Sequence, residues 1–94
     1  MIGKHVVVTT DHNKRGVFAG VLESRDGKGA VLTDAQQCVY WSSETKGVFG
    51  LASIGPQKGS RVGPVVPRLD LDGVAAVCEM TEEAVEKWKE MPWD

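Results

Sequence analysis

The first half of the chain alternates apolar and polar side chains with a period of two, which is typical of half-buried β-strands. Residues 4–10, KHVVVTT, are rich in β-branched side chains and precede a polar cluster that favours a turn. Residues 16–26, GVFAGVLESRD, continue the alternation over a longer stretch. Gly20 lies in the middle of this second segment, where a residue without a Cβ favours a sharp bend. The pattern predicts two strands, the second of them bent.

Two further strands are expected before residue 42. Asp26 and Gly27 form a strong hairpin signal. Residues 30–34, AVLTD, should therefore return beside the bent strand. The polar residues AQQ then interrupt the apolar pattern, and residues 38–41, CVYW, resume it. These segments predict a long antiparallel β-meander in which the polar break separates two strands.

The second half of the chain carries weaker signals. Residues 45–55, TKGVFGLASIG, place apolar side chains at helical spacing, but the glycines among them allow only a short helical turn. Residues 56–68, PQKGSRVGPVVPR, contain three prolines and must form a loop or an edge strand rather than a central strand. Residues 73–80, GVAAVCEM, are almost continuously apolar, which predicts a final, well-buried strand.

A C-terminal helix is the clearest single element. Thr81 is a favourable N-cap, and acidic residues fill the first turn of a helix predicted over residues 82–90. Its apolar stripe consists of Ala84, Val85, Trp88 and Met91. Pro92 ends the helix. The prediction is one α+β domain over residues 1–94, β-rich over 4–80 with a helix over 81–91, built on a small antiparallel β-barrel or curved β-sheet.

Composition limits the class of protein and its partners. A chain of 94 residues with 41% hydrophobic and 26% charged residues is typical of one soluble globular domain with a small core. The first residues contain no apolar stretch typical of a secretion signal, and no run approaches the roughly 18 residues of a membrane span. We expect a cytoplasmic protein without membrane contact. The formal net charge of −2 disfavours nonspecific binding to nucleic acid.

Candidate catalytic and metal-binding groups are few. Cys38 and Cys78 lie in apolar segments without a CxxC pair, which predicts buried free thiols rather than metal ligands. His5 lies in a predicted strand and His12 in the following turn, and no motif connects either to a nucleophile. We therefore expect no enzyme, no cofactor and no metal site.

Tyr40 and Trp41 are neighbours in a predicted strand, where consecutive side chains point to opposite faces. One large ring is expected to point out of the core, unless the strand twists under a helix and both are buried. An exposed ring forfeits the burial of about 150 to 250 Å² and so favours a partner surface. That partner is a second subunit, the C-terminal helix through Trp88, or a planar ligand such as a nucleobase. Ser42 and Ser43 would be donors at the rim of a ligand site.

A cationic stretch follows these aromatic residues. Lys58, Arg61 and Arg68 occur in a stretch, residues 58–68, that contains no acid. The segment is not a phosphate-binding P-loop, because Lys58 precedes the glycine that it should follow. Loops with free N–H groups and cations bind anions well, although a solvated loop that balances the acidic C-terminal helix is the alternative. The predicted ligand site comprises Tyr40, Trp41, Ser42, Ser43, Lys58, Arg61 and Arg68.

The succession VFAGVLE, AVLTDA, YWSS and a proline-rich loop resembles a family of small bacteriophage proteins of unknown function. In that family a strand with a Tyr-Trp-Ser motif precedes a short helix. The match runs from Val6 to Val77, and Tyr40, Trp41 and Ser42 are its most specific element. The resemblance implies a small accessory protein in the host cytoplasm that acts by binding.

Some phage counter-defence proteins are small oligomers that sequester cyclic or adenosine-derived nucleotides at subunit interfaces. By this analogy, we expect a homo-oligomer in which Tyr40 or Trp41 stacks on a base and Arg61 and Arg68 bind phosphates. The alternatives are a protein-interaction or structural factor that buries Trp41 or Trp93 against a partner, or an Sm-like RNA-binding protein.

A second resemblance is to Sm-like ring-forming barrels, in which a bent strand reads G-x-L before an acidic turn and a returning strand. The residues near those positions are Gly20, Leu22, Asp26 and Leu32. Gly29 or Ala30 stands where Sm-like proteins place an RNA-binding asparagine, and the later Arg-Gly motif is missing. The resemblance implies an Sm/SH3-like barrel that assembles into rings, but RNA binding is not carried over.

Overall fold

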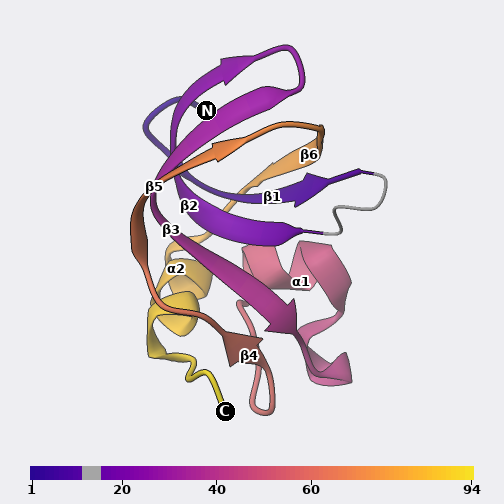
Figure 1. Cartoon of the computed structure of the whole chain (residues 1–94). Helices are drawn as coiled ribbons and strands as arrows, with labels where there is room; N and C mark the ends of the chain where they lie inside the picture. Colours follow the sequence, from indigo (N-terminus) through magenta and orange to yellow (C-terminus); the bar gives the residue numbers. More distant parts are fainter. Residues whose placement is uncertain (12–15) are drawn as a thin grey trace.

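The β-branched first half of the chain forms a three-stranded antiparallel meander (Figure 1). In the computed structural model, which describes residues 1–11 and 16–94, its strands are β1 (His5–Thr10), β2 (Val17–Asp26) and β3 (Gly29–Tyr40). β1 pairs with β2, and β2 pairs with β3 through the tight turn predicted at Asp26 and Gly27. The expected meander and its hairpin are confirmed.

Three further strands complete an open sheet. They are β4 (Arg61–Val62), β5 (Val66–Leu71) and β6 (Val74–Glu79). β4 and β5 pair with β3, and β6 pairs with β1. Within the described part of the chain, β6 at one end of the sheet pairs with neither β4 nor β5 at the other, so the sheet is open rather than a closed barrel. The α+β class and the antiparallel sheet are confirmed.

The polar break predicted after residue 34 does not end a strand. β3 runs without interruption from Gly29 to Tyr40. Asp34 instead adopts a left-handed conformation with φ of 51°, and the pairing with β2 shifts by one residue there. This is a β-bulge, which absorbs an extra residue without ending the strand. The expectation of two separate strands was therefore wrong.

The last strand, β6, is less buried than its apolar sequence predicted. It lies at the edge of the sheet beside β1, and Ala75 and Ala76 are exposed. Only its first residue, Val74, is fully buried. The strand itself was predicted correctly, but its full burial was not. β5 fulfils the expectation of edge structure for the proline-rich segment, because it pairs only with β3 and contains Pro67.

Both helices lie against one face of the sheet (Figure 1). After the 3-10 turn η2 (Ser43–Thr45), α1 (Gly47–Ser53) is the short helix that was expected. A side chain at Gly50 would collide with the carbonyl of Thr45, so this glycine is required by close packing. α2 (Glu82–Glu90) has the predicted bounds, and the Thr81 side chain accepts a hydrogen bond from the Ala84 N–H at 3.0 Å.

The first three strands separate two hydrophobic cores. Val6 and Val8 of β1 pack inside the curve of the sheet with Leu22, Leu32 and Leu71. Val7, on the opposite face of the same strand, packs toward the helices in a cluster with Ala19, Cys38, Leu51, Ala52, Val62 and Trp88. β1 is thus buried on both faces, which explains its continuous run of valines.

Candidate functional site

The end of the sheet beyond the two cores presents an aromatic ring beside a guanidinium group. Tyr40, the last residue of β3, is the direct cross-strand partner of Arg61 in β4. Tyr40 is 56% exposed, and Arg61 is exposed as well. The register between β3 and β4 shifts between Cys38 and Tyr40, so this pair follows an irregularity in the ladder. Backbone pairing thus places an aromatic residue and a cationic residue opposite each other on neighbouring strands.

The aromatic neighbours Tyr40 and Trp41 differ in burial, but β3 ends at Tyr40, so Trp41 does not belong to the strand that was predicted over residues 38–41. Trp41 is partly buried and packs against the helix-side core, whereas Tyr40 is exposed. The structure thus excludes the arrangement in which both rings are buried. Trp41 stabilises the fold, and Tyr40 is the ring that is available to a partner.

A network of hydroxyl groups fixes the loop that carries Lys58. Thr45 is fully buried, and its Oγ1 accepts a hydrogen bond from the Gln57 N–H at 3.0 Å. Ser60 Oγ lies 3.4 Å from Thr45 Oγ1 and accepts from the Ser42 N–H at 3.1 Å. Ser42 Oγ also contacts Thr45 Oγ1 at 3.4 Å. Ser42 is therefore engaged within the protein, and of the two serines predicted at the rim only Ser43 is exposed.

Lys58 lies in this fixed loop, between Gln57 and Ser60, and its side chain is exposed. Ion pairs among the described residues join Lys28 to Asp11 and Arg68 to Glu23, and neither Lys58 nor Arg61 has a carboxylate within 4.0 Å in that part of the chain. Their charges are therefore available to an anion. We call the exposed side chains of Tyr40, Lys58 and Arg61 the Tyr40 surface.

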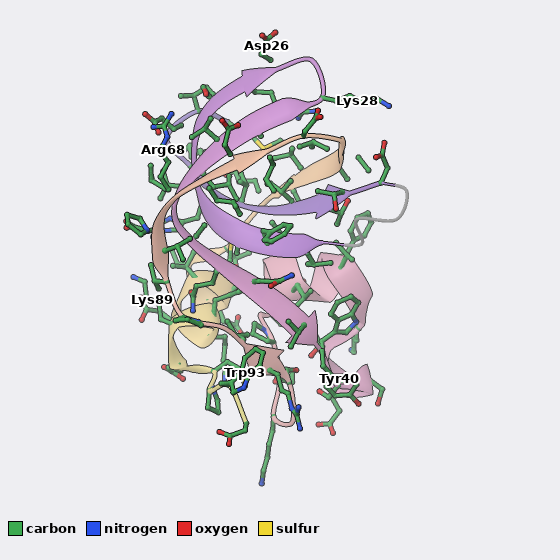
Figure 2. All side chains as sticks on the ribbon, in the orientation of Figure 1. Asp26, Lys28, Tyr40, Arg68, Lys89 and Trp93 are labelled. Carbon is green, nitrogen blue, oxygen red and sulfur yellow. The ribbon has the colours of Figure 1, made fainter. Side chains whose placement is uncertain are left out.

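Arg68, the third predicted cation, does not belong to this surface. It pairs with Thr33 in the middle of β3, seven positions before Tyr40, a separation of about 23 Å along an extended strand. Its NH1 group donates to Glu23 Oε2 at 3.0 Å. Figure 2 shows Arg68 and Tyr40 on opposite sides of the molecule. The strand register thus separates two arginines that are close in sequence.

Trp93 is an aromatic residue that the predicted site did not include. The Val62 N–H donates to the Pro92 carbonyl at 3.1 Å, which holds the C-terminal residues against β4. Trp93 is 55% exposed and lies at the same end of the molecule as Tyr40 (Figure 2). It also lines a cavity of about 360 Å³ together with Phe18, Pro64, Val66 and Leu69. The only signal in the sequence was its position just after a helix-ending proline.

The remaining chemical groups form no recognisable catalytic arrangement. Cys38 and Cys78 are free, but only Cys38 is buried, and burial raises the pKa of its thiol from 9.0 to about 11. His5 is partly buried in β1, and His12 lies outside the described residues. In the described part of the chain, no three His, Cys, Asp or Glu side chains are grouped to hold a metal ion.

Comparison with known proteins places this chain in a family. The model of a family described as a domain of unknown function (DUF6948) matches residues 3–88. The chain belongs to this family. The DUF6948 match covers all six strands and most of α2, and it ends before Trp93. No curated protein and no solved structure matches the chain.

The helices of this DUF6948 protein are short. None within residues 1–11 and 16–94 is long and apolar enough to cross a membrane. The family description assigns no activity, so the function must be argued from the Tyr40 surface itself.

Proposed function

We propose that this DUF6948 protein is a non-catalytic binding module that holds an anionic, nucleotide-type ligand on the Tyr40 surface. The observation that carries the proposal is the cross-strand pairing of the exposed Tyr40 with Arg61. Among the described residues, no carboxylate lies within 4.0 Å of the Arg61 guanidinium group. A tyrosine ring stacks on a nucleobase with about 1 to 3 kcal/mol per base. A guanidinium group binds phosphate oxygens in a bidentate manner.

Lys58 adds a second cation to the same end of the sheet. The backbone of its loop is fixed by the buried Thr45 hydroxyl, so the lysine stem starts from a defined position. A preorganised loop loses less conformational entropy when it binds a ligand than a mobile one does. This arrangement favours a ligand with one planar group and at least one phosphate.

The Tyr40 surface supports the expectation of a homo-oligomer. Sites for small molecules bury about 70 to 90% of the ligand, whereas Tyr40, Lys58 and Arg61 are all exposed on the isolated chain. A second surface is therefore needed to enclose the ligand. We propose that a second copy supplies this surface, so that the ligand lies at an interface between subunits.

A phage counter-defence role in the host cytoplasm, with sequestration of an immune signal, is the specific form of this proposal. It rests on the resemblance of the Tyr-Trp-Ser segment and on the properties of the Tyr40 surface. An Sm/SH3-like relationship is supported by the bent meander, in which the last strand returns beside the first. It would require β5 and β6 to approach each other more closely than in the open sheet.

A protein-interaction or structural accessory factor is the second candidate function. The observation that favours it is the exposure of Phe49 and Trp93, which are 79% and 55% exposed. Large exposed apolar side chains are common at protein interfaces. Sm-like RNA binding is disfavoured by the net charge of −2 and by the absent motif residues.

Isothermal titration calorimetry and thermal-shift measurements with three probes distinguish these functions. The probes are cyclic di-AMP, ADP-ribose and a short single-stranded oligo(A) RNA. A nucleotide-binding module gains thermal stability with one of the first two probes, because a ligand at 100 times its Kd stabilises by about 2.7 kcal/mol. Preference for the RNA would support the Sm-like alternative, and binding of no probe would favour the interaction factor.

Matched arginine variants test the Tyr40 surface directly. Tyr40→Ala and Arg61→Ala should each weaken binding at least tenfold, whereas Arg68→Ala, which removes the same charge elsewhere, should leave affinity unchanged. Equal effects of the two arginine variants would refute the proposed surface. Light scattering after size exclusion should show an oligomer, and a monomer at high concentration would refute the interfacial site.

A further inference from the structure

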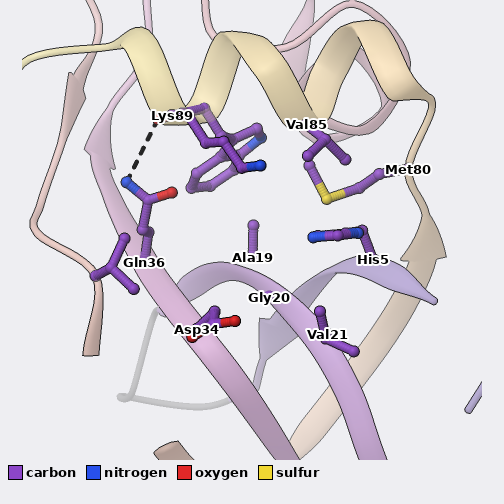
Figure 3. Close-up of a pocket in the computed structure, with 11 residues that line it drawn as sticks. His5, Ala19, Gly20, Val21, Asp34, Gln36, Met80, Val85 and Lys89 are labelled. Atoms are coloured by element: carbon purple, nitrogen blue, oxygen red, sulfur yellow. Dashed lines mark hydrogen bonds between the residues drawn. The ribbon is translucent and has the colours of Figure 1, made fainter. Parts of the chain in front are cut away.

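A second, independent cleft lies between α2 and the sheet, away from the Tyr40 surface (Figure 3). Its volume is about 400 Å³, within the range of about 300 to 1,000 Å³ that is usual for small-molecule sites. Apolar side chains form its walls, among them Ala19, Val21, Met80 and Val85. His5, Asp34, Gln36 and Lys89 contribute the polar groups.

The β-bulge turns Asp34 toward this cleft. Gln36 pairs with Ala19 and Thr33 pairs with Val21, so two residues of β3, Asp34 and Ala35, face Gly20 alone. Asp34 takes the left-handed conformation with φ of 51°, which is uncommon for a residue other than glycine. Bulges that re-aim a side chain are over-represented beside binding and active sites. The bulge therefore gives an exposed carboxylate a defined position at the cleft.

Gln36 defines the opposite wall. Its Nε2 donates to the Gly63 carbonyl at 3.2 Å and to the Trp88 carbonyl at 3.4 Å, which connects β3 to α2. Figure 3 shows the amide oxygen of Gln36 turned toward the cleft. Because both amide protons are used within the protein, this group can only accept a hydrogen bond from a ligand.

The charged groups at the cleft have opposite signs. Lys89 projects from α2, and Asp34 lies on the sheet below it (Figure 3). Neither has an ion-pair partner within 4.0 Å in the described part of the chain. A ligand could therefore place an anionic group at Lys89 and a cationic donor at Asp34.

We propose that this cleft binds a small zwitterion with an apolar body, of the chemical class of an aromatic amino acid. The apolar walls accommodate the side chain of such a molecule. Lys89 binds its carboxylate, Asp34 binds its ammonium group, and Gln36 Oε1 accepts a further hydrogen bond. The site is separate from the Tyr40 surface, because Asp34 precedes Tyr40 by six positions in β3, about 20 Å along an extended strand.

L-tryptophan is a suitable probe in a ¹H–¹⁵N correlation titration of the full chain. The proposal predicts saturable shifts at the amides of Asp34, Gln36 and Lys89. Two related probes each remove one charge: tryptamine lacks the carboxylate, and indole-3-propionate lacks the ammonium group. Both should bind about tenfold more weakly than L-tryptophan, because each loses one charge-assisted hydrogen bond.

Paired variants assign each charge to its residue. Lys89→Gln should lower the affinity for L-tryptophan about tenfold and leave the affinity for tryptamine unchanged. Asparagine tolerates the left-handed conformation. Asp34→Asn should therefore lower the affinity for L-tryptophan and leave the affinity for indole-3-propionate unchanged. Lys87→Gln removes the same charge from the same helix outside the cleft and should have no effect.

The absence of saturable shifts in the wild-type cleft would overturn the proposal. Equal effects of Lys89→Gln and Lys87→Gln would also overturn it, since they would show only a dependence on overall charge. Tyr40→Ala should leave L-tryptophan binding intact, so failure of the cleft and failure of the Tyr40 surface can be told apart.

Discussion

The indole Nε1 of Trp88 donates a buried hydrogen bond to the Leu51 carbonyl at 3.0 Å and so connects α2 to the C-terminal end of α1. The last carbonyl groups of a helix lack partners within that helix. Residues of α2 and its N-cap donate hydrogen bonds to three such carbonyl groups of α1. Trp88 donates to Leu51, the Thr81 N–H donates to Ala52 at 3.0 Å, and the Thr81 hydroxyl donates to Ser53 at 2.7 Å. A helix of seven residues is thereby stabilised by its neighbour.

Trp88→Phe should lower the free energy of unfolding by about 2 kcal/mol or more. The substitution leaves the Leu51 carbonyl without its partner and creates a space in the helix-side core. Urea denaturation followed by circular dichroism measures this change. Trp93→Phe is the matched control, because Trp93 is 55% exposed, and it should alter stability by no more than about 0.5 kcal/mol. Similar losses for both variants would contradict the assigned role of Trp88.

Gly20→Ala should destabilise the protein by about 1 to 3 kcal/mol through overpacking. A Cβ at this position would lie 2.8 Å from the Thr33 carbonyl oxygen and 3.2 Å from the Ala35 Cα, and both are backbone atoms that cannot move aside easily. At Gly63, a new Cβ would meet its nearest atom only at 3.7 Å. Gly63→Ala should therefore be tolerated in the same denaturation experiment. A neutral Gly20→Ala variant would show that the bulge adapts to a side chain.

Thr45→Val should lower the free energy of unfolding by about 1 to 3 kcal/mol, because it leaves the Gln57 N–H without its hydroxyl acceptor. The fully buried position of Thr45 prevents water from replacing that bond. Thr45→Ser retains the hydroxyl and should recover most of the stability. Hydrogen exchange at the Gln57 amide provides the local measurement: it should accelerate in Thr45→Val and stay slow in Thr45→Ser.

Cys38 should resist thiol reagents at pH 8, because burial raises the pKa of its thiol to about 11 and only the thiolate reacts. Mass spectrometry after N-ethylmaleimide treatment should find Cys78, which is only partly buried, labelled first. Faster labelling of Cys38 than of Cys78 in the folded protein would contradict this prediction.

The same pKa shift predicts a dependence of stability on pH. The unfolded chain releases the Cys38 proton near pH 9.0, whereas the folded protein retains it up to about pH 11. The contribution of this group to stability is therefore complete below pH 9 and is lost as the pH rises toward 11. Cys38→Val should show a shallower decline in the free energy of unfolding over that interval than the wild-type protein. Parallel declines would refute the shift.

The sequence predicted those elements whose signals are local. The bounds of α2 followed from the N-cap at Thr81 and the apolar stripe through Ala84 and Trp88, all within a few residues of one another. The hairpin at Asp26 and Gly27 also depends on neighbouring residues alone. Such features are visible without the rest of the fold, since each is stabilised by contacts along the chain.

The same pattern failed where a distant partner decides the outcome. Polar residues after Asp34 indicated a break, yet β3 continues because Gly20 of β2 accommodates the bulge. The apolar residues of β6 indicated burial, but its position at the sheet edge leaves Ala75 and Ala76 exposed. Hydrophobicity favours burial, whereas the position of a strand in the sheet determines how much burial it receives.

The amino-acid sequence by itself predicted that one of two consecutive aromatic rings leaves the core, unless a twist under a helix buries both, and it did not show that the strand ends between them. Tertiary structure alone decided that this ring is Tyr40, and that Arg61 rather than Arg68 lies beside it. The physical reason is register: hydrogen bonds between strands that are distant in sequence fix which residues face each other, and no local pattern encodes that alignment.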